Sequence, residues 1–550
     1  MRDTVPELRH ASDHSLLVTF AEEISLVSHQ LVKTAFLALQ RDGLPGVTNL
    51  HPAYASLLVS YEPASIDREE LRALVAERLE TVDLTELPEA PVREIPVVYG
   101  GEGGPDLKAV ADGCGLAEAE VVRQHASGAY VVSFLGFSPG FPYLAGMPAA
   151  IAVPRHPTPR TRVEAGSVAI AGTQTGIYPL ASPGGWQVIG RTPLELFDPG
   201  RMPPALLAIG DRVRVVPVPV AEFVREGRAS PRSRSRDRSG GVRIQEAGFQ
   251  STVQDLGRPG YAHLGVSACG AADRFSLLAG NRLLGNPDGA PAIEMTLLGG
   301  TFVFDEATAI AVTGSDFSPT LDGGPVPLWR TVEIRPGQTL RFGATRGGAR
   351  CTVCVRGGID VEPVLGSVST HLTSGLGGVE GRALRHGDVL PVGKTVIPSE
   401  SRGFDRTLGS RMLGRKEVRV VAGAQWERFS PEARSALLSS CYRVLEDSSR
   451  MGLRLAGPAL RAGSRGEMIT EGVSLGALQV PEGGQPIISF VEHQTTGGYP
   501  QIACVIAADL QRVGQLRPRD EVRFVEVTLA QADAARRELD AALRTGVVGR

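Results

Sequence analysis

One segment divides the chain into two parts: residues 225–241 have the sequence REGRASPRSRSRDRSGG. Apart from one proline, the segment has no apolar residue larger than alanine. The free-energy cost of ordering this segment would therefore exceed the free energy gained by burying its side chains. We predict a flexible linker here, with a folded half on each side. An arginine/serine region that binds RNA is the alternative, but the position between two folded halves favours the linker.

The length and composition favour several domains built mainly from β-strands. A single hydrophobic core rarely serves more than about 300 residues, and this chain has 550. Its 42% hydrophobic and 21% charged residues are ordinary for a folded protein. The 66 glycines and 39 prolines, together with few long helical patterns, favour many short strands joined by tight turns. We predict a mainly β fold with some α+β structure.

Five segments are expected along the chain. Residues 1–90 alternate strand and helix patterns, and Asp67 with Glu70 indicates a helix start, so this segment should form a small α+β domain. Residues 91–224 carry short β runs and should form a barrel, followed by the linker at 225–241. Residues 242–400 and 401–550 continue in the same style. We predict one further barrel in each.

An internal repeat supports related β units in the two halves. Gln174–Pro179 (QTGIYP) resembles Gln494–Pro500 (QTTGGYP). The strand endings at 210–216 and 519–525 also resemble each other, and a third such ending occurs at 386–392. From these matches we infer three related barrel units, two of them in the second half.

Charge and cysteine content exclude several classes of protein. A formal net charge of −3 gives no global field that would attract nucleic acid or an anionic membrane. The first 30 residues lack the pattern of a secretion signal, and no apolar run is long enough to cross a membrane. Six scattered cysteines suit reduced thiols. We expect a cytoplasmic protein that binds neither nucleic acid nor membrane.

A serine motif at 136–140 (GFSPG) matches the pattern of a hydrolase nucleophile but lacks one backbone N–H group that such an enzyme needs. The oxyanion hole of such enzymes needs the backbone N–H of the residue after the serine, and that residue is Pro139, which has none. We therefore expect a rigid loop that presents Phe137, Phe141 and Tyr143, and a ligand-lining role for this loop stays open.

Two further motifs are interpreted as structural. The run from Gly387 to Thr395 has the wrong glycine spacing for a phosphate-binding loop and contains a proline. Cys351 and Cys354 lie in a predicted strand, where positions three apart face opposite sides, so we expect two buried structural cysteines. The histidines show no zinc-site spacing, and we predict no metal site built by the protein.

Polar residues in glycine- and proline-rich loops are the candidates for a binding site, because such loops carry binding groups on a rigid scaffold. About half of them are expected to serve turns and ion pairs instead. They lie at 160–162, 174–178, 184–191, 254–258, 263 and 273–274.

These loops carry a resemblance to a known family. Residues 134–144, 159–163, 169–179 and 183–193 resemble allophanate hydrolase subunit 1, now called the B-type subunit of 5-oxoprolinase. Residues 252–260, 270–273, 314–316, 356–359 and 494–500 resemble its C-type subunit, a biotin-dependent carboxyltransferase-like family. The resemblance covers nearly the whole chain and implies a fusion of the two subunits. It also implies cyclophilin-like barrels, one in the first half and two in the second.

The resemblance implies an activity: ATP-dependent opening of 5-oxo-L-proline to L-glutamate, with a separate A-type subunit of 5-oxoprolinase and with Mg²⁺ brought by the nucleotide. We expect this chain to activate the lactam, by phosphorylation, and the A-type subunit to hydrolyse it. Phosphoryl transfer needs cationic groups around the transferred phosphate. We predict as catalytic residues Asp255, Arg258, His263 and Asp273. We predict as substrate- or ATP-binding residues Arg160, Arg162, Gln174, Thr175, Tyr178, Trp186, Arg191, Gln254, Gln494, Thr495, Thr496 and Tyr499.

Two alternatives stay open. The first is the carboxyltransferase component of a urea or related amide carboxylase. No Met-Lys dipeptide for covalent biotin occurs in the chain, so a separate carrier would be needed. The second is a non-enzymatic regulator that binds a histidine kinase. We also expect His493 to pack as a neutral core histidine and the chain to form a homo-oligomer.

Overall fold

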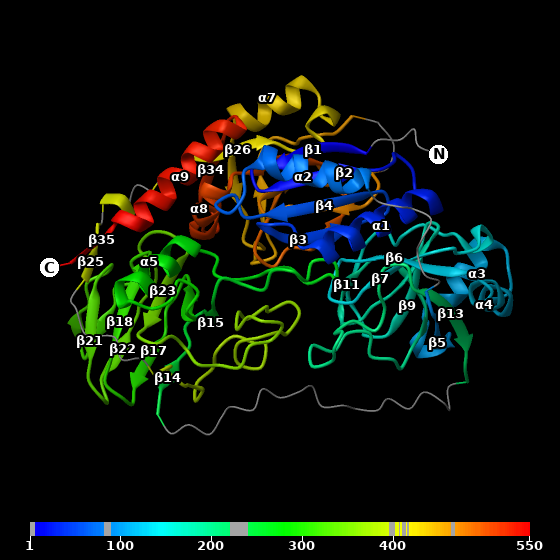
Figure 1. Cartoon of the computed structure of the whole chain (residues 1–550). Coiled ribbons are helices and arrows are strands. Elements are labelled where there is room, and N and C mark those ends of the chain that lie inside the picture. Colours follow the sequence, from blue (N-terminus) through cyan, green and yellow to red (C-terminus); the bar gives the residue numbers. More distant parts are fainter. Residues whose placement is uncertain are drawn as a thin grey trace.

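The structure is a computed structural model of the chain. It describes residues 6–81, 90–219, 240–394, 402–405, 407–409, 414, 417–463 and 468–549. Most of the predicted linker, residues 225–239, lies outside the described residues. In Figure 1 the N-terminal unit and the last barrel lie together at the top, above the first barrel and the middle unit. None of the helices in the described ranges is long and apolar enough to cross a membrane.

The N-terminal unit is a four-stranded sheet covered by two helices, as predicted. Alternating apolar residues such as Leu16 and Val18 enter its core. Ser25 caps the first helix, and the Asp67 carboxylate accepts the N–H groups of Glu69 and Glu70 at the start of the second. The sheet has the order β1-β2-β4-β3. The elements are β1 (Glu7–Ser12), β2 (Ser15–Thr19), α1 (Leu26–Asp42), β3 (Val47–Pro52), β4 (Ser56–Tyr61) and α2 (Arg68–Glu80).

The second unit is a closed barrel of seven strands with a separate two-stranded ribbon, β8–β11. Two helices, α3 and α4, pack on it and contribute Val110 and Val121 to its core. Its elements are β5 (Val92–Tyr99), η1 (Gly101–Gly103), α3 (Leu107–Cys114), α4 (Glu118–Ala126), β6 (Tyr130–Leu135), β7 (Pro142–Ala145), η2 (Ala149–Ile151), β8 (Arg160–Val163), β9 (Ser167–Ala171), β10 (Gln174–Ile177), β11 (Ser182–Gly184), β12 (Gln187–Arg191) and β13 (Arg212–Pro217).

The middle unit corrects the prediction of a third barrel. Its described strands form a six-stranded and a five-stranded sheet around a shared core, not a closed ring. The predicted strand ending at 386–392 pairs antiparallel with the first strand of this unit, β14. Its elements are β14 (Val242–Glu246), β15 (Gln250–Gln254), α5 (Arg274–Leu284), β16 (Ala292–Thr296), β17 (Thr301–Phe304), β18 (Thr308–Gly314), β19 (Thr320–Leu321), β20 (Gly324–Pro325), β21 (Thr331–Ile334), β22 (Thr339–Arg341), β23 (Arg350–Val355) and β24 (Val389–Leu390). Cys351 and Cys354 are buried in β23, as expected.

The last unit is again a closed barrel of seven strands with a two-stranded ribbon, β29–β32. Helix α9 runs from this barrel to the middle unit, where Leu543 packs beside Phe275 and Trp329. Its elements are β25 (Arg402–Phe404), β26 (Glu417–Ala422), η4 (Trp426–Arg428), α7 (Pro431–Ser439), β27 (Cys441–Val444), β28 (Gly452–Ala456), β29 (Glu471–Gly472), β30 (Ala477–Gln479), β31 (Ile487–Ser489), β32 (Thr496–Gly497), β33 (Gln501–Val505), η5 (Ala507–Asp509), α8 (Leu510–Gln515), β34 (Glu521–Glu526), α9 (Leu529–Thr545) and β35 (Val547–Gly549).

The two barrels share one topology. In each, the last strand pairs parallel with the first, β13 with β5 and β34 with β26. The order of strands round the rings then matches β6, β7, β10, β9 and β12 with β27, β28, β31, β30 and β33. The ribbons match as well. The predicted relation between 210–216 and 519–525 is confirmed, since these segments overlap the equivalent strands β13 and β34.

The predicted match of Gln174–Pro179 with Gln494–Pro500 is wrong, because the two segments lie in strands that are not equivalent. Gln174–Ile177 is β10, a strand of the first barrel, and its equivalent in the last barrel is β31 at Ile487–Ser489. The similar letters at 494–500 instead contain β32, the equivalent of the ribbon strand β11. Short glycine- and threonine-rich strings therefore recur in two different structural positions, because each suits a tight turn between short strands.

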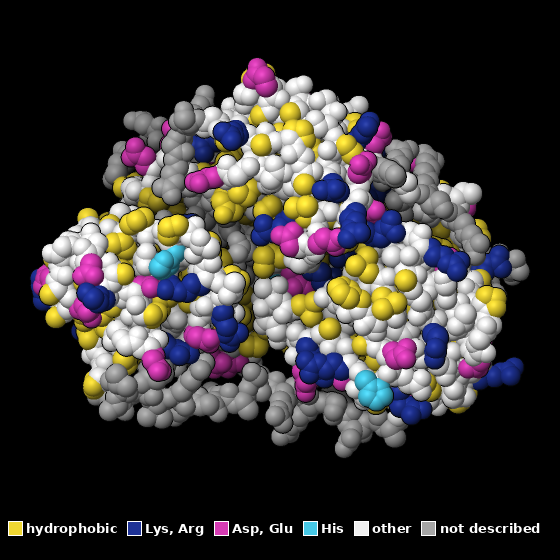
Figure 2. Space-filling view, turned by 180° about the vertical axis from the view of Figure 1, so that it is seen from behind, with side chains coloured by type: hydrophobic (Ala, Val, Ile, Leu, Met, Phe, Trp, Pro, Cys, Tyr) yellow, Lys and Arg dark blue, Asp and Glu magenta, His cyan; other side chains and the backbone are white. Residues whose placement is uncertain are grey.

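The face of the molecule in Figure 2 carries no large patch of side chains with a single sign of charge. Lys and Arg side chains alternate there with Asp and Glu, among scattered hydrophobic side chains. This distribution suits the small net charge of the sequence.

Candidate functional site

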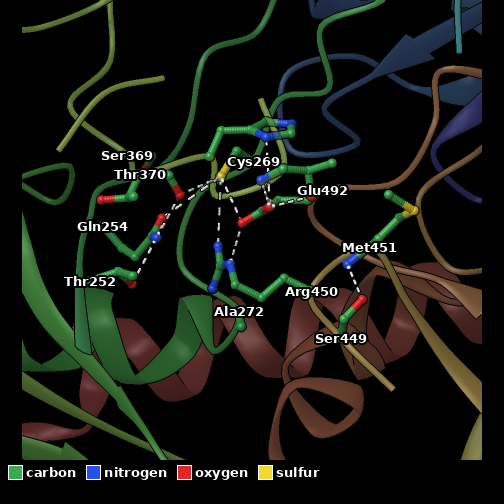
Figure 3. A network of polar contacts seen from close by, with 12 residues as sticks. Thr252, Gln254, Cys269, Ala272, Ser369, Thr370, Ser449, Arg450, Met451 and Glu492 are labelled. Carbon is green, nitrogen blue, oxygen red and sulfur yellow. Dashed lines mark hydrogen bonds and ion pairs between the residues drawn. The ribbon is translucent and has the colours of Figure 1, made fainter. Parts of the chain in front are cut away.

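A buried ionic cluster lies where the middle unit meets the last barrel. Its centre is Arg450, whose Nη1 donates to Glu294 Oε1 (2.5 Å) and whose Nε donates to Glu492 Oε1 (2.6 Å). Nη2 donates to the Gly270 carbonyl (2.6 Å) and lies 3.6 Å from Cys269 Sγ. Figure 3 shows the guanidinium in contact with both the thiol and Glu492. One arginine thus ties two units together.

The charges of the cluster are retained in spite of burial. Burial alone would lower the pKa of Arg450, but the carboxylate of Glu294, with Cys269 and Glu492, raises it overall. Burial alone would raise the pKa of Glu492, but the electrostatic interactions with Arg450 and His371, with the hydrogen bonds from Arg450 and the Thr373 N–H, lower it overall. Arg350, 3.8 Å from Glu294, has its pKa lowered to about 10 by burial. Buried ion pairs gain little stability over an apolar core, so such a cluster is better explained by positioning.

Cys269 is held in an uncommon backbone conformation. Its φ of 60° lies in the left-handed region, which costs energy for any residue except glycine. The thiol donates to the Thr370 carbonyl (3.3 Å), and burial raises its pKa. Cys269 is therefore a neutral thiol in a strained loop, not a reactive thiolate.

Two predicted residues, Gln254 and Arg258, border the thiol. Gln254 Nε2 donates to Thr252 Oγ1 and to the Thr370 carbonyl, both at 3.0 Å. Its Oε1 faces the Cys269 thiol at 3.9 Å, a weak contact. Arg258 is fully buried and donates to the Ser369 carbonyl, while its Nη1 has no partner within the described residues. The site thus has one weakly used acceptor and one unused donor.

His371 lies on the other side of the cluster and was not predicted. Its Nε2 is 2.9 Å from Ser267 Oγ, and its Nδ1 accepts the Ser374 N–H at 3.2 Å. Burial lowers its pKa to about 4. The imidazole is therefore neutral near pH 7, with its proton on Nε2 facing Ser267. This arrangement can donate a hydrogen bond through the serine but is not set up to activate it as a nucleophile.

Asp255 and Asp273, predicted as catalytic, are occupied by local contacts. The Asp255 carboxylate accepts the N–H groups of Gly257 and Val368. It also accepts the hydroxyl groups of Ser367 and Ser369. Asp273 caps helix α5, and burial raises the pKa of its carboxyl. Both hold loops around the cluster, and a catalytic role stays a prediction.

His263, Gln494, Thr495, Thr496 and Tyr499 lie at the junction between the halves or near it. His263 packs on Phe36 of α1 with ring centroids 5.2 Å apart, and burial lowers its pKa to about 4. Thr495 and Thr496 are buried, with hydroxyl groups that have no partner in the described structure. Gln494 is partly buried and Tyr499 is 47% exposed. His493 has its pKa lowered to about 4 by burial, which agrees with the expected neutral histidine.

The predicted residues of the first half gather elsewhere, on and around the β8–β11 ribbon. Arg160 makes a two-pronged ion pair with Asp106 (2.6 and 2.8 Å), and His156 lies 3.3 Å from the same carboxylate. Arg162 pairs with Glu164 at the surface. These partners belong to the first half of the chain, whereas Arg258 donates to a carbonyl of the second half.

The remaining first-half residues serve the barrel. Thr175 is buried and lies 2.9 Å from His125 Nε2, and Arg191 donates to the Ala165 carbonyl. Tyr178 and Trp186 belong to a buried aromatic cluster, and Gln174 is partly buried at the start of β10. That cluster also contains Phe141 and Tyr143, which corrects the expectation that the 136–140 loop presents them to solvent.

The ionic cluster was missed because its members are far apart in sequence. A local signal exists for two of them: Glu294 stands between Ile293 and Met295, and Glu492 follows Phe490 and Val491. A lone carboxylate in an apolar strand requires a buried partner. Nothing in the sequence around Arg450 identifies that partner. No group of three or more His, Cys, Asp or Glu residues suited to a metal occurs in the described part of the chain.

Comparison with known proteins covers most of the chain. The family described as "Carboxyltransferase domain, subdomain C and D" matches residues 6–207, and "Carboxyltransferase domain, subdomain A and B" matches residues 264–526. The chain is 38% identical to the C-type subunit of 5-oxoprolinase from Escherichia coli over 298 residues, 54% of this chain and 94% of that protein. It is 41% identical to the B-type subunit of 5-oxoprolinase from Bacillus subtilis over 227 residues, 40% of this chain and 95% of that protein.

Two further similarities extend the comparison. The crystal structure of TTHA0988 is 35% identical with a TM-score of 0.83, covering 94% of this chain and all of that one. Urea amidolyase of Saccharomyces cerevisiae is 34% identical over 327 residues, 55% of this chain but only 18% of that protein.

Proposed function

Because the chain belongs to the carboxyltransferase-domain family, with the B-type and C-type subunits of 5-oxoprolinase joined in one polypeptide, we propose that it is an ATP-dependent 5-oxoprolinase component. It activates 5-oxo-L-proline, by phosphorylation, for hydrolysis to L-glutamate by a separate A-type subunit. Mg²⁺ enters with the nucleotide. The observation that carries the proposal is the coverage: one chain spans 94% of a C-type subunit in one species and 95% of a B-type subunit in another.

The chemistry of the buried cluster fits a cyclic amide. A lactam offers a carbonyl oxygen that accepts a hydrogen bond and an adjacent N–H that donates one. The unused donor at Arg258 Nη1 and the weakly used acceptor at Gln254 Oε1, which lies 3.9 Å from Cys269 Sγ, would be the complementary pair. A cation at the carbonyl oxygen would also stabilise the charge that develops there when phosphate is transferred.

The test is the formation of glutamate from 5-oxoproline by this chain with the A-type subunit of 5-oxoprolinase and ATP, against each protein alone. We expect glutamate only in the complete mixture. The matched variant is Gln254→Leu, which is close in size and removes the acceptor together with the two hydrogen bonds that Nε2 donates; we expect its KM for 5-oxoproline to rise about tenfold or more. Glutamate in the absence of ATP, or none in the complete mixture, would contradict the proposal.

A second function is favoured by one observation, the similarity of 55% of the chain to urea amidolyase. In that case the chain would transfer a carboxyl group from a biotin carrier to urea or a related amide. The same assay with urea, bicarbonate and a biotin carrier separates the two. Carboxylated urea without glutamate would replace the first proposal with the second.

A further inference from the structure

We propose that the first half of the chain positions the ionic cluster of the second half, with Asn49, His51 and Gly136 as positioning residues. Two segments carry two of the partners of Arg450, Gly270 and Glu492: residues 260–270, called the first arm, and residues 492–497, called the second arm. The first half holds both arms at two places. The inference deepens the proposed function and rests on it in part, since turnover is one of its two readouts.

The first place is strand β3. Asn49 Oδ1 accepts the N–H groups of Gly260 (2.8 Å) and Ala262 (3.3 Å) on the first arm. His51 Nδ1 lies 3.2 Å from the Thr495 carbonyl on the second arm. Because residues two apart on a strand face the same side, one face of β3 holds both arms at once.

The protonation state of His51 suits this task. Its Nε2 lies 3.0 Å from Ser60 Oγ, and burial lowers its pKa to about 3. The imidazole is therefore neutral, and the serine hydroxyl donates to Nε2. The ring proton is therefore on Nδ1, and the Nδ1–H group donates a hydrogen bond to the Thr495 carbonyl.

The second place is the 136–140 loop of the first barrel, which is wedged between the arms. The Gly140 N–H donates to the Leu264 carbonyl of the first arm at 2.8 Å. Gly136 meets the second arm so closely that a Cβ atom there would lie 2.1 Å from Thr496 Oγ1. This close approach, not a left-handed backbone, favours glycine at 136.

Both arms run directly from these contacts into the cluster. Four residues after Gly265, the neighbour of Leu264, comes Cys269, followed by Gly270, whose carbonyl binds Arg450. Four residues before Thr496 comes Glu492, which binds the other side of the same guanidinium. Spreading the arms would move Gly270 and Glu492 apart on either side of Arg450, and a misplacement of about 1 Å can lower a rate about 100-fold.

The experiment compares variants of the full chain that release the arms with control variants that leave both arms in place. The test variants are Asn49→Leu and Gly136→Ala. The controls are Ser15→Ala, which removes a buried hydrogen bond of 2.7 Å to Ser474 outside both arms, and Gly483→Ala, where a Cβ atom meets nothing within 4 Å. Each variant is checked for folding by its melting temperature. The readouts are kcat with the A-type subunit of 5-oxoprolinase present, and the alkylation rate of Cys269, followed by peptide mass spectrometry.

We expect both test variants to lower kcat about 10- to 100-fold and to speed the alkylation of Cys269, while the controls match the wild type. Adding Thr496→Ala to Gly136→Ala removes the hydroxyl that the new methyl group meets, so the alkylation rate of Cys269 should move back toward wild type. Test variants that alkylate at the control rate would overturn the inference. If the wild type shows no turnover, the proposed function fails, but the alkylation comparison still decides the positioning.

Discussion

The β8–β11 and β29–β32 ribbons occupy the same place in two barrels of one topology but have opposite surroundings. The first carries Arg160 and Arg162, whose side chains are 34% and 66% exposed. The second is covered: Gly472 packs on Leu58 of the N-terminal unit, and Thr496 packs on Gly136. In the repeated scaffold, therefore, one ribbon is open to solvent and the other forms a contact between the two halves of the chain. Position in a fold does not determine what a segment does.

The buried cluster around Arg450, together with the covered β29–β32 ribbon, is called the covered region. We expect the largest loss of stability when the charge of Arg450 is removed. Arg450→Met leaves Glu294 and Glu492 buried without their cation, so we expect the free energy of unfolding to fall by about 3–5 kcal/mol. Arg160→Met, at the open ribbon, is the matched change and should cost less, because the Arg160 side chain is 34% exposed and Asp106 keeps its hydrogen bond from the Val188 N–H. Thermal unfolding of both variants measures the difference. Equal losses of unfolding free energy in the two variants would contradict the expected difference between the buried and the open region.

Acid should also act on the covered region. His51 and His371 have folded-state pKa values of about 3 and about 4, below an ordinary value near 6.5. The unfolded chain therefore binds protons that the folded chain does not, and stability falls as the pH drops below about 6.5. Between pH 7 and 5 we expect each histidine to cost on the order of 2 kcal/mol.

Denaturation at a series of pH values checks this expectation, with His51→Gln as the comparison. Glutamine keeps a donor but does not titrate, so the variant should lose less stability between pH 7 and 5 than the wild type does. A pH profile that the substitution leaves unchanged would contradict the assignment of His51.

At the open ribbon a smaller effect is expected from Asp106→Asn. The carboxylate binds Arg160 and also accepts the Val188 N–H at 2.6 Å, so it joins the ribbon to the barrel. We expect a loss of about 1–2 kcal/mol, since the amide keeps one acceptor and loses the ion pair. Unfolding by urea measures it. A loss as large as that of Arg450→Met would reverse the order proposed for the two regions.

The smallest effect should come from Arg162→Ala. Arg162 pairs with Glu164 at the surface, where ion pairs contribute little because water and salt screen them. The melting temperature should match the wild type at both low and high salt. If Arg162 binds the nucleotide, as the sequence suggested, ATP affinity measured by calorimetry would fall although stability does not; an unchanged affinity removes Arg162 from the predicted site.

Much of the fold could be predicted from local sequence. Capping and apolar periodicity predict the helix after Asp67, a strand at 55–61 and the buried strand with Cys351 and Cys354. The structure has all three, with the second at Ser56–Tyr61. Two of the three predicted barrels are closed. The third is two sheets, because short strands with similar turns allow more than one way of pairing.

The candidate site was predictable only in part. Gln254 and Arg258 were found because they lie in a glycine-rich motif that the resemblance marks. Glu294, Arg450 and Glu492 were not, since each stands alone among ordinary neighbours. The match of Gln174–Pro179 with Gln494–Pro500 was also misleading, because similar short strings fill different strands.

The sequence by itself determined the mainly β class, the division into two halves and the family, since these depend on composition, periodicity and long motifs. Only the tertiary structure decided which charges meet, which ribbon is covered and that β3 and the 136–140 loop hold both arms of the cluster. The physical reason is range. Backbone preferences act over a few neighbouring residues, whereas a buried charge is stabilised by whichever partner the packing of distant segments brings within a few ångströms.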